Sequence, residues 1–236
     1  MSTLALPASP ARKDALVIGL VGLAHSISHF SQLLLAPLFP WLKDEFAVSY
    51  AQLGALLTIF FVVSCIVQAL SGFLVDKHGP RPVLMAGLAL LGVAAFGYAS
   101  SSSYWMLAAF SVVAGTGNGV FHPVDYTLLN RKIGKARLGH AYSVHGITGS
   151  LGWALAPALL VPITLATSWR VALMCAGGLA FVVLAVLWGR RDELSLTPAA
   201  VPAAVATDAD SASGPRRAES PLAFLTLPAV WMCFGF

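Results

Sequence analysis

Long apolar stretches without Asp, Glu, Lys or Arg dominate the first 190 residues of the chain. They cover residues 15–42, 46–75, 82–124, 138–169 and 171–189. A bilayer core takes about 20 apolar residues per helix, so each stretch is long enough to span a membrane. The third is long enough for two helices, and the four serines at 100–103 divide it. The pattern predicts six membrane-spanning helices and an all-α transmembrane fold.

Composition agrees with a lipid environment. The chain is 58% hydrophobic and 10% charged, with a mean hydropathy of +0.80, whereas soluble domains are about 25% charged. The net charge of +4 does not indicate nucleic-acid binding, because no basic cluster lies on an expected soluble surface. We therefore expect the lipid bilayer, and no nucleic acid, as a partner.

The basic residues sort to one side of the predicted membrane. With the N-terminus placed in the cytoplasm, 12 of the 14 Lys and Arg residues fall in cytoplasmic segments, and only Lys43 and Arg170 fall on the other side. Cytoplasmic loops carry such an excess in membrane proteins. The sequence predicts a multi-pass protein with a cytoplasmic N-terminus.

Four segments are expected along the chain. Residues 1–14 form a cytoplasmic N-terminus, and residues 15–190 form the six-helix bundle. Residues 191–221 contain a stretch rich in Ala, Pro, Ser and Asp, which is typical of a flexible linker. Residues 222–236 are apolar again but too short to span a bilayer, so they are expected to begin a truncated seventh helix.

The loop between the second and third spans carries a spaced motif of Gly72, Asp76, Lys77, Gly79 and Arg81. A glycine allows close helix packing or a tight turn, and a carboxylate can meet an arginine or a helix N-terminus. Any short cytoplasmic loop is basic and rich in turn residues, which is the alternative reading. The spacing and place of the motif resemble the signature loop of the major facilitator superfamily. That resemblance implies a conformational latch at these five residues.

A second resemblance lies in the fourth span. Residues 114–123 contain Gly-Thr-Gly followed by Phe-His-Pro. Residues 24–46 cover most of the first span and the Lys-Asp-Glu-Phe that follows it. Both segments resemble transporters of the fosmidomycin-resistance type. The resemblance implies two six-helix bundles with alternating access in a bacterial inner membrane. This chain would supply the N-terminal bundle and part of a seventh helix, and a C-terminal six-helix bundle would be its missing partner.

Two patterns of the superfamily are altered here. The arginine often found in the fourth span is absent, with Ser111 four residues before Gly115. The antiporter pattern of the fifth span keeps Gly152 and Pro157 but has Ala where Gly is usual. The fifth span also has small residues on one stripe, which predicts close helix packing: Gly146, Gly149, Gly152 and Ala156.

Polar and ionisable side chains recur within three spans. They are His25, His29 and Gln32 in the first span, Asn118, His122 and Asp125 in the fourth, and His145 in the fifth. The spacing places each group of three on a single helical face. An ionisable group inside the membrane costs about 2.5–3.5 kcal/mol for Asp, so its presence suggests a function.

In the resembled fold, the first and fourth spans line a central cavity, which makes these residues candidates for a substrate and proton site. We expect His122 and Asp125 to form a proton-responsive pair, because a carboxylate one turn away favours the protonated imidazole. The alternative is that each histidine bonds a backbone carbonyl or a serine and only fixes the packing.

The resulting prediction is a secondary active transporter that exports a small solute in exchange for protons. One alternative is proton-coupled uptake of an organic acid or a sugar. Another, of a different class, is a half-size membrane module or an inactive fragment that does not transport.

An intramembrane metalloenzyme is a further alternative. His25 and His29 have the spacing of metal ligands on a helix. Ser26 stands where zinc proteases have a Glu as general base, and no other helix supplies an evident third ligand with a base. We therefore expect no enzyme activity, no bound metal and no cofactor.

Overall fold

The computed structural model describes residues 10–196, which form helices joined by short turns, with no strand among them. The described helices are α1 (Pro10–Gln32), α2 (Phe39–Phe46), α3 (Tyr50–His78), α4 (Pro80–Ser100), α5 (Tyr104–Asn118), α6 (Phe121–Lys132), α7 (Leu138–Ala166) and α8 (Trp169–Gly189). Three short 3-10 turns accompany them: η1 (Ala36–Leu38), η2 (Lys135–Arg137) and η3 (Arg191–Leu194). The all-α prediction is confirmed.

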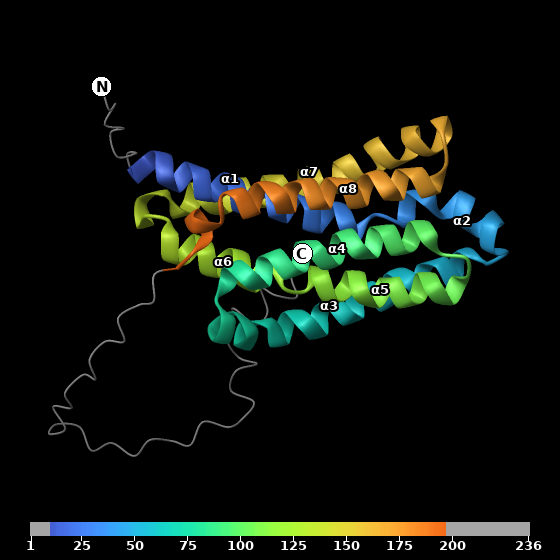
Figure 1. Ribbon diagram of the computed structural model, residues 1–236, viewed down its shortest axis with the longest axis horizontal. Helices are drawn as coiled ribbons and strands as arrows, with labels where there is room; N and C mark the ends of the chain where they lie inside the picture. Colours follow the sequence, from blue (N-terminus) through green and yellow to red (C-terminus); the bar gives the residue numbers. More distant parts are fainter. Residues whose placement is uncertain (1–9, 197–236) are drawn as a thin grey trace, which may run out of the picture. The chain divides into compact units, whose positions relative to one another are not determined.

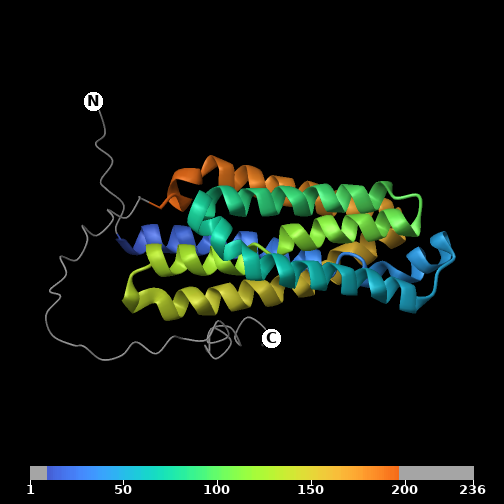
Figure 2. The same cartoon turned by 90° about the horizontal axis from the view of Figure 1, so that it is seen from below.

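The long helices run side by side and form one elongated bundle (Figures 1 and 2). The turns joining α3 to α4 and α6 to α7 lie at the end of the bundle where α1 begins. Helix α2 and the turns that follow α4 and α7 lie at the opposite end. Among the described residues, the basic side chains therefore gather at the end where α1 begins, whereas Lys43 and Arg170 lie at the other.

Five of the described helical segments are long and apolar enough to cross a membrane by themselves. The predicted fourth span is the exception, because the structure divides it into α5 and α6 at Gly119 and Val120. The two helices together cross the bundle once, as the ribbon shows (Figure 1). The six predicted spans are thus present, and one of them is a broken helix.

Capping residues explain where several helices begin. Ser49 caps α3 and forms a capping box with Gln52, and the serines Ser103 and Ser168 cap α5 and α8. Each side-chain oxygen accepts a hydrogen bond from a backbone N–H that has no partner within the helix. The serine cluster at 100–103 therefore ends one span and starts the next, as the sequence predicts.

Two boundaries differ from expectation. Helix α1 begins at Pro10 rather than at residue 15, so part of the expected N-terminal segment is helical. The expected linker begins with η3, which ends at Leu194. The rest of that linker and the expected seventh helix, residues 197–236, lie outside the described residues and remain predictions.

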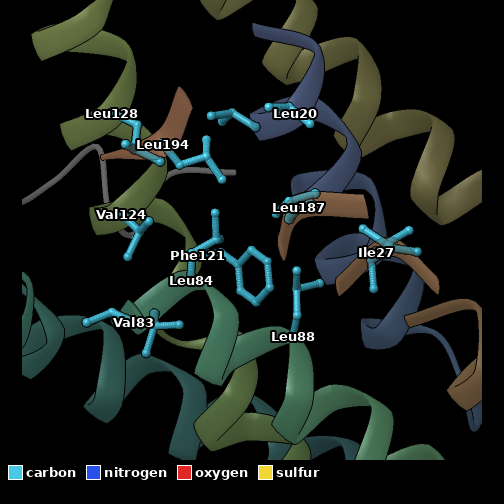
Figure 3. Packing of buried hydrophobic residues seen from close by; sticks show 14 of the residues in the cluster. Leu20, Ile27, Val83, Leu84, Leu88, Phe121, Val124, Leu128, Leu187 and Leu194 are labelled. Carbon is cyan, nitrogen blue, oxygen red and sulfur yellow. The ribbon is translucent and has the colours of Figure 1, made fainter. Parts of the chain in front are cut away.

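Apolar side chains fill the interior of the bundle in two clusters, one toward each end. In the first, Phe121 of α6 lies against Leu84 and Leu88 of α4, with Leu187 of α8 nearby (Figure 3). In lipid, such contacts stabilise helix association through van der Waals packing rather than through removal of apolar area from water. Helix α6 packs against α1, α3 and α4, which fixes the position of its polar residues.

The outer faces of α3 and α7 are apolar and exposed. Phe73 is 76% exposed on α3, and Ile147 is 59% exposed on α7. Large exposed apolar side chains are typical of surfaces that contact lipid or another membrane helix. The polar residues described next lie on the inner sides of α1, α6 and α7.

Candidate functional site

Helix α1 presents His25, His29 and Gln32 toward α6 and α7, because they lie four and three residues apart. Close packing of α1 on α7 makes this possible. A Cβ at Gly152 of α7 would collide with the backbone carbonyl oxygen of Ser26. Gly149 faces the rings of His25 and His29. Two glycines of the predicted stripe thus permit close packing, whereas Gly146 has nothing within 4 Å of a Cβ position and lines a shallow surface groove instead.

Asp125 of α6 is the centre of the polar cluster. Its side chain is fully buried, and its Oδ2 accepts hydrogen bonds from Nδ1 of His25 (3.0 Å) and Nε2 of His145 (3.1 Å). Its Oδ1 is buried and has no hydrogen-bond partner within the described part of the chain. One carboxylate oxygen therefore links three membrane-spanning segments.

Four imidazole rings surround this carboxylate. The His25 ring stacks on His145 with a centroid distance of 3.5 Å and lies 4.4 Å from His29 and 5.4 Å from His122. We name these four histidines together with Asp125 the His–Asp cluster. An ionisable group in hydrocarbon is expensive unless it is paired, and the cluster provides such partners.

The hydrogen-bond partners of Asp125 lie on other helices, and its predicted electrostatic pairing with His122 stays a prediction. His122 stacks on Tyr126, with the two rings 5.8 Å apart and only 12° from parallel. The two hydrogen bonds of Asp125 come instead from His25 and His145, which are far away in the sequence. Helical periodicity identified neighbours on α6, but the packing of α1 and α7 determined which imidazoles reach the carboxylate.

Asn118, the last residue of α5, anchors the broken span to two other helices. Its Nδ2 donates to Oγ of Ser28 on α1 (2.7 Å), and its Oδ1 accepts from Oγ of Ser64 on α3 (2.9 Å). Gln32 Nε2 approaches the same Oδ1 at 3.5 Å. The amides predicted to line the cavity therefore lie together.

Sequence reasoning missed three members of this network, Ser28, Ser64 and Trp153. Trp153 Nε1 donates to Oε1 of Gln32 (2.8 Å), and the indole ring lies 4.6 Å from the His29 ring. A tryptophan near the middle of a span, away from the interfaces, needs a partner for its N–H, which is a signal that could have identified it. The two serines carry no comparable sequence signal.

The predicted latch loop is a tight turn between α3 and α4. Gly79 has φ of +82° and forms both the end of α3 and the start of α4, as its conformational freedom allows. Asp76 and Lys77 are exposed, and Arg81 Nη1 donates to Oγ of Ser195 (2.7 Å). The helix contact expected at Gly72 is absent within residues 10–196, since nothing lies within 4 Å of a Cβ position there.

Two ion pairs at the ends of the bundle were also missed. At the end where α1 begins, Oδ2 of Asp14 lies 2.6 Å from a terminal guanidinium nitrogen of Arg137 and accepts from the Gly134 N–H. At the opposite end, Arg170 pairs with Glu45 at 2.9 Å. These contacts join segments far apart in the sequence, so periodicity gives no indication of them.

Ligand-type atoms gather within the His–Asp cluster. One group consists of His25, His29 and His122, and a second of His25, Asp125 and His145; in each, the nitrogen or oxygen atoms lie within 4.8 Å of one another. The sequence did not make this third histidine evident, and the expectation of no bound metal stays a prediction. Residue 122 is nearly a hundred positions from the first pair, and only the fold brings it near.

Several named proteins are similar to this chain in sequence. The chain is 30% identical to the fosmidomycin resistance protein of Escherichia coli over 75% of its own length and 42% of the relative's. It is 25% identical to the probable sulfoacetate transporter SauU of Cupriavidus necator and 24% identical to the membrane sensor protein UhpC of E. coli, over 69% and 73% of its length and 38% and 40% of theirs. The chain thus spans about two fifths of the length of these relatives.

The fold also matches that of a solved crystal structure. The crystal structure of tetrameric PepTSo2 superposes with a TM-score of 0.62 at 15% identity, covering 78% of this chain and 41% of that one. The family model of the Major Facilitator Superfamily matches residues 21–236. The six spans, the turn at Gly79 and these similarities have one explanation: the chain is a multi-pass membrane protein that belongs to the major facilitator superfamily.

Proposed function

We propose that the whole protein exports a small solute in exchange for protons by alternating access, with Asp125 as the proton-binding group. The observation that carries this proposal is the link from one oxygen of Asp125 to His25 on α1 and His145 on α7. An intramembrane carboxylate among histidines is typical of proton relays.

The geometry suggests how proton binding changes the bundle. Ionised Asp125 accepts from two histidines on different helices through one oxygen. A protonated carboxyl is itself a donor and has less capacity to accept, so one of these contacts weakens. Proton binding at Asp125 therefore loosens the connection of α6 to α1 or α7, which is a local change that alternating access can use.

Export is favoured over uptake by the 30% identity to a resistance protein. The cluster contains no Lys or Arg among its hydrogen-bond and ring partners in the described residues, so an anionic solute, including a phosphonate such as fosmidomycin, would need a cation from outside them. Uptake of an organic acid or a sugar remains the second candidate, because SauU is named for sulfoacetate and another relative is named a probable L-galactonate transporter.

The test uses the full-length protein in lipid vesicles with fosmidomycin as the probe substrate. Coupling between two binding sites changes affinity about 5- to 150-fold, and we expect a change of this size in fosmidomycin affinity between acidic and neutral pH. Asp125→Asn keeps the size of the side chain but removes the titrating group, so the change should disappear. Asp192→Asn, at an exposed site, is the matched control.

Two outcomes would contradict the proposal. One is an undiminished pH effect in Asp125→Asn. The other is the absence of fosmidomycin-driven proton movement, measured with a pH-sensitive dye, in the wild-type protein. Transport in the inward direction alone would support the uptake alternative, and solute binding without transport would support a sensor.

We also propose that Asp76 and Arg81 act in a latch that holds the cytoplasmic side closed, with partners beyond the described residues. The exposure of Asp76 and the sharp turn at Gly79 are compatible with a contact to another bundle. Asp76→Asn should slow transport while leaving fosmidomycin affinity nearly unchanged, because it alters switching and not the solute site. Equal transport rates in variant and wild type would argue against the latch.

A further proposal concerns the orientation of the protein in the membrane. We propose a bacterial cytoplasmic membrane with the N-terminus in the cytoplasm, supported by the basic residues at the end where α1 begins. The relatives cited above come from bacteria.

A further inference from the structure

We propose that His25, His29 and His122 together bind one late first-row divalent metal ion, for which Zn²⁺ is the probe, and that Asp125 orients His25 from outside the coordination sphere. The inference concerns metal binding and does not depend on the proposed transport. It uses histidines of two helices that the sequence alone does not bring together.

A small inward movement of the three histidine rings would bring their ligand atoms to metal-binding distance. Their ligand atoms lie within 4.8 Å of one another. A point equidistant from three atoms at that limit lies about 2.8 Å from each, whereas a zinc–nitrogen bond is about 2.0–2.1 Å. Each ring must therefore move inward by about 0.7 Å at most, which is within the range of a side-chain torsion.

His25 has the second contact that metal-binding histidines usually make. Its Nδ1 lies 3.0 Å from Oδ2 of Asp125, which leaves Nε2 for a metal ion. A ligating histidine almost always donates its other N–H to a carboxylate, a carbonyl or water, and this bond fixes the ring and raises its basicity. Asp125 therefore occupies the position of a supporting carboxylate.

His29 has the opposite feature, a lack of partners. Both Nδ1 and Nε2 are buried and make no hydrogen bond within residues 10–196. A buried polar group without a partner is costly, and a metal ion would satisfy one of these nitrogens. Gly149 lies beside the same ring nitrogens, since a Cβ at this position would lie 3.0 Å from Nε2 of His25 and 3.1 Å from Nδ1 of His29.

The second group of ligand-type atoms is a weaker candidate. In His25, Asp125 and His145, the atoms that approach one another already form two hydrogen bonds, and the His25 and His145 rings are stacked. A metal ion would have to break both bonds. This group therefore serves as the support for the first one.

The donor set indicates the class of ion. Three imidazoles suit Zn²⁺, Cu²⁺ or Ni²⁺, whereas Mg²⁺ and Ca²⁺ require mostly oxygen ligands. Three protein ligands also leave a fourth position for water or for a donor atom of a solute.

The test measures Zn²⁺ binding to the purified full-length protein, carrying an affinity tag without histidine, by equilibrium dialysis and metal analysis. We expect one saturable Zn²⁺ per chain. His29→Ala and His122→Ala should each weaken binding by more than about 100-fold, and Asp125→Asn by about 10- to 100-fold, which is the usual effect of losing an outer partner. His140→Ala is the matched control, because this histidine is exposed on α7, and it should bind like wild type.

Several results would overturn the assignment. They are the absence of saturable binding in the wild type, unchanged binding in both His29→Ala and His122→Ala, or a loss caused by His145→Ala that exceeds theirs. If alanine variants do not fold, His29→Gln and His122→Gln replace them. X-ray absorption of the zinc-loaded wild type gives an independent measure, with three imidazoles expected; sulfur ligation would contradict the proposal.

Discussion

The two halves of one uninterrupted apolar stretch, residues 82–124, fold in different ways. The first half lies in α4, a continuous helix whose buried side chains are nearly all apolar or small. The second half enters α5, which ends at Asn118, and then continues into α6 with His122 and Asp125. The comparison indicates that the break and the polar chemistry belong together in this protein.

The reason lies in how each half is packed. Helix α4 contacts α5 through Gly87 and Gly117, where a Cβ on either residue would lie 2.9 Å from the carbonyl oxygen of the other. At the break, Gly119 approaches α3 in the same way, but its neighbour Asn118 is tied to Ser28 and Ser64. A backbone interrupted inside the membrane is tolerated only where protein groups satisfy it.

Among the variants that test this comparison, Gly119→Ala should have the largest effect on the free energy of unfolding. The new Cβ would lie 2.5 Å from the backbone oxygen of Ser64 and 2.7 Å from Cβ of Val67, so α3 would have to move. Overpacking of this kind lowers the free energy of unfolding by about 1–3 kcal/mol. The thermal unfolding temperature of the detergent-purified protein measures it.

A matched control for that variant is Gly178→Ala, in α8, where nothing lies within 4 Å of a Cβ position. It should leave stability unchanged or raise it by up to about 1 kcal/mol, because alanine favours helix. Equal destabilisation by both variants would mean that the close packing of Gly119 against α3 does not cause the loss of stability in Gly119→Ala.

A smaller effect is expected from Asn118→Ala. The substitution removes the amide that bonds to Ser28 and Ser64, and interhelical hydrogen bonds in membrane proteins contribute about 0.6 kcal/mol each, up to about 1.7. A loss of about 1–2 kcal/mol should appear as a lower unfolding temperature. Unchanged stability would show that the break is held by packing alone.

The smallest effect should come from Tyr98→Phe, on the continuous helix α4. Tyr98 donates to Oγ of Ser111 (3.0 Å), but Ser111 also bonds the Leu107 carbonyl oxygen (3.1 Å) and so stays satisfied. We expect a loss of about 0.6 kcal/mol, the average for such a bond. A loss as large as that of Asn118→Ala would remove the distinction between the two halves.

Much of the architecture was predictable. The charge-free runs gave the six spans, and the serines at 100–103 gave the turn between the third and fourth. The turn at Gly79 also followed from its residue type. The break at Gly119 has a local signal in Pro123, which cannot donate a hydrogen bond to the Gly119 carbonyl four residues earlier, and Gly119 also lies close to α3 there.

The sequence analysis named most residues of the candidate site, but it did not give the contacts among them. Histidines, amides and a carboxylate in otherwise apolar spans stood out because such groups are costly in lipid. The contacts among these groups could not be found from the sequence. A helical period relates only residues a few positions apart, and the partners of Asp125 are 100 and 20 positions away.

The sequence by itself determined the six spans of the described part of the chain and where polar groups are placed along each helix, because hydropathy and helical periodicity are local properties. Only the tertiary structure decided that Asp125 meets His25 and His145, while both ring nitrogens of His29 have no hydrogen-bond partner among residues 10–196. The physical reason is that contacts between helices depend on how closely the whole bundle packs, here partly on Gly149 and Gly152, which let α7 approach α1.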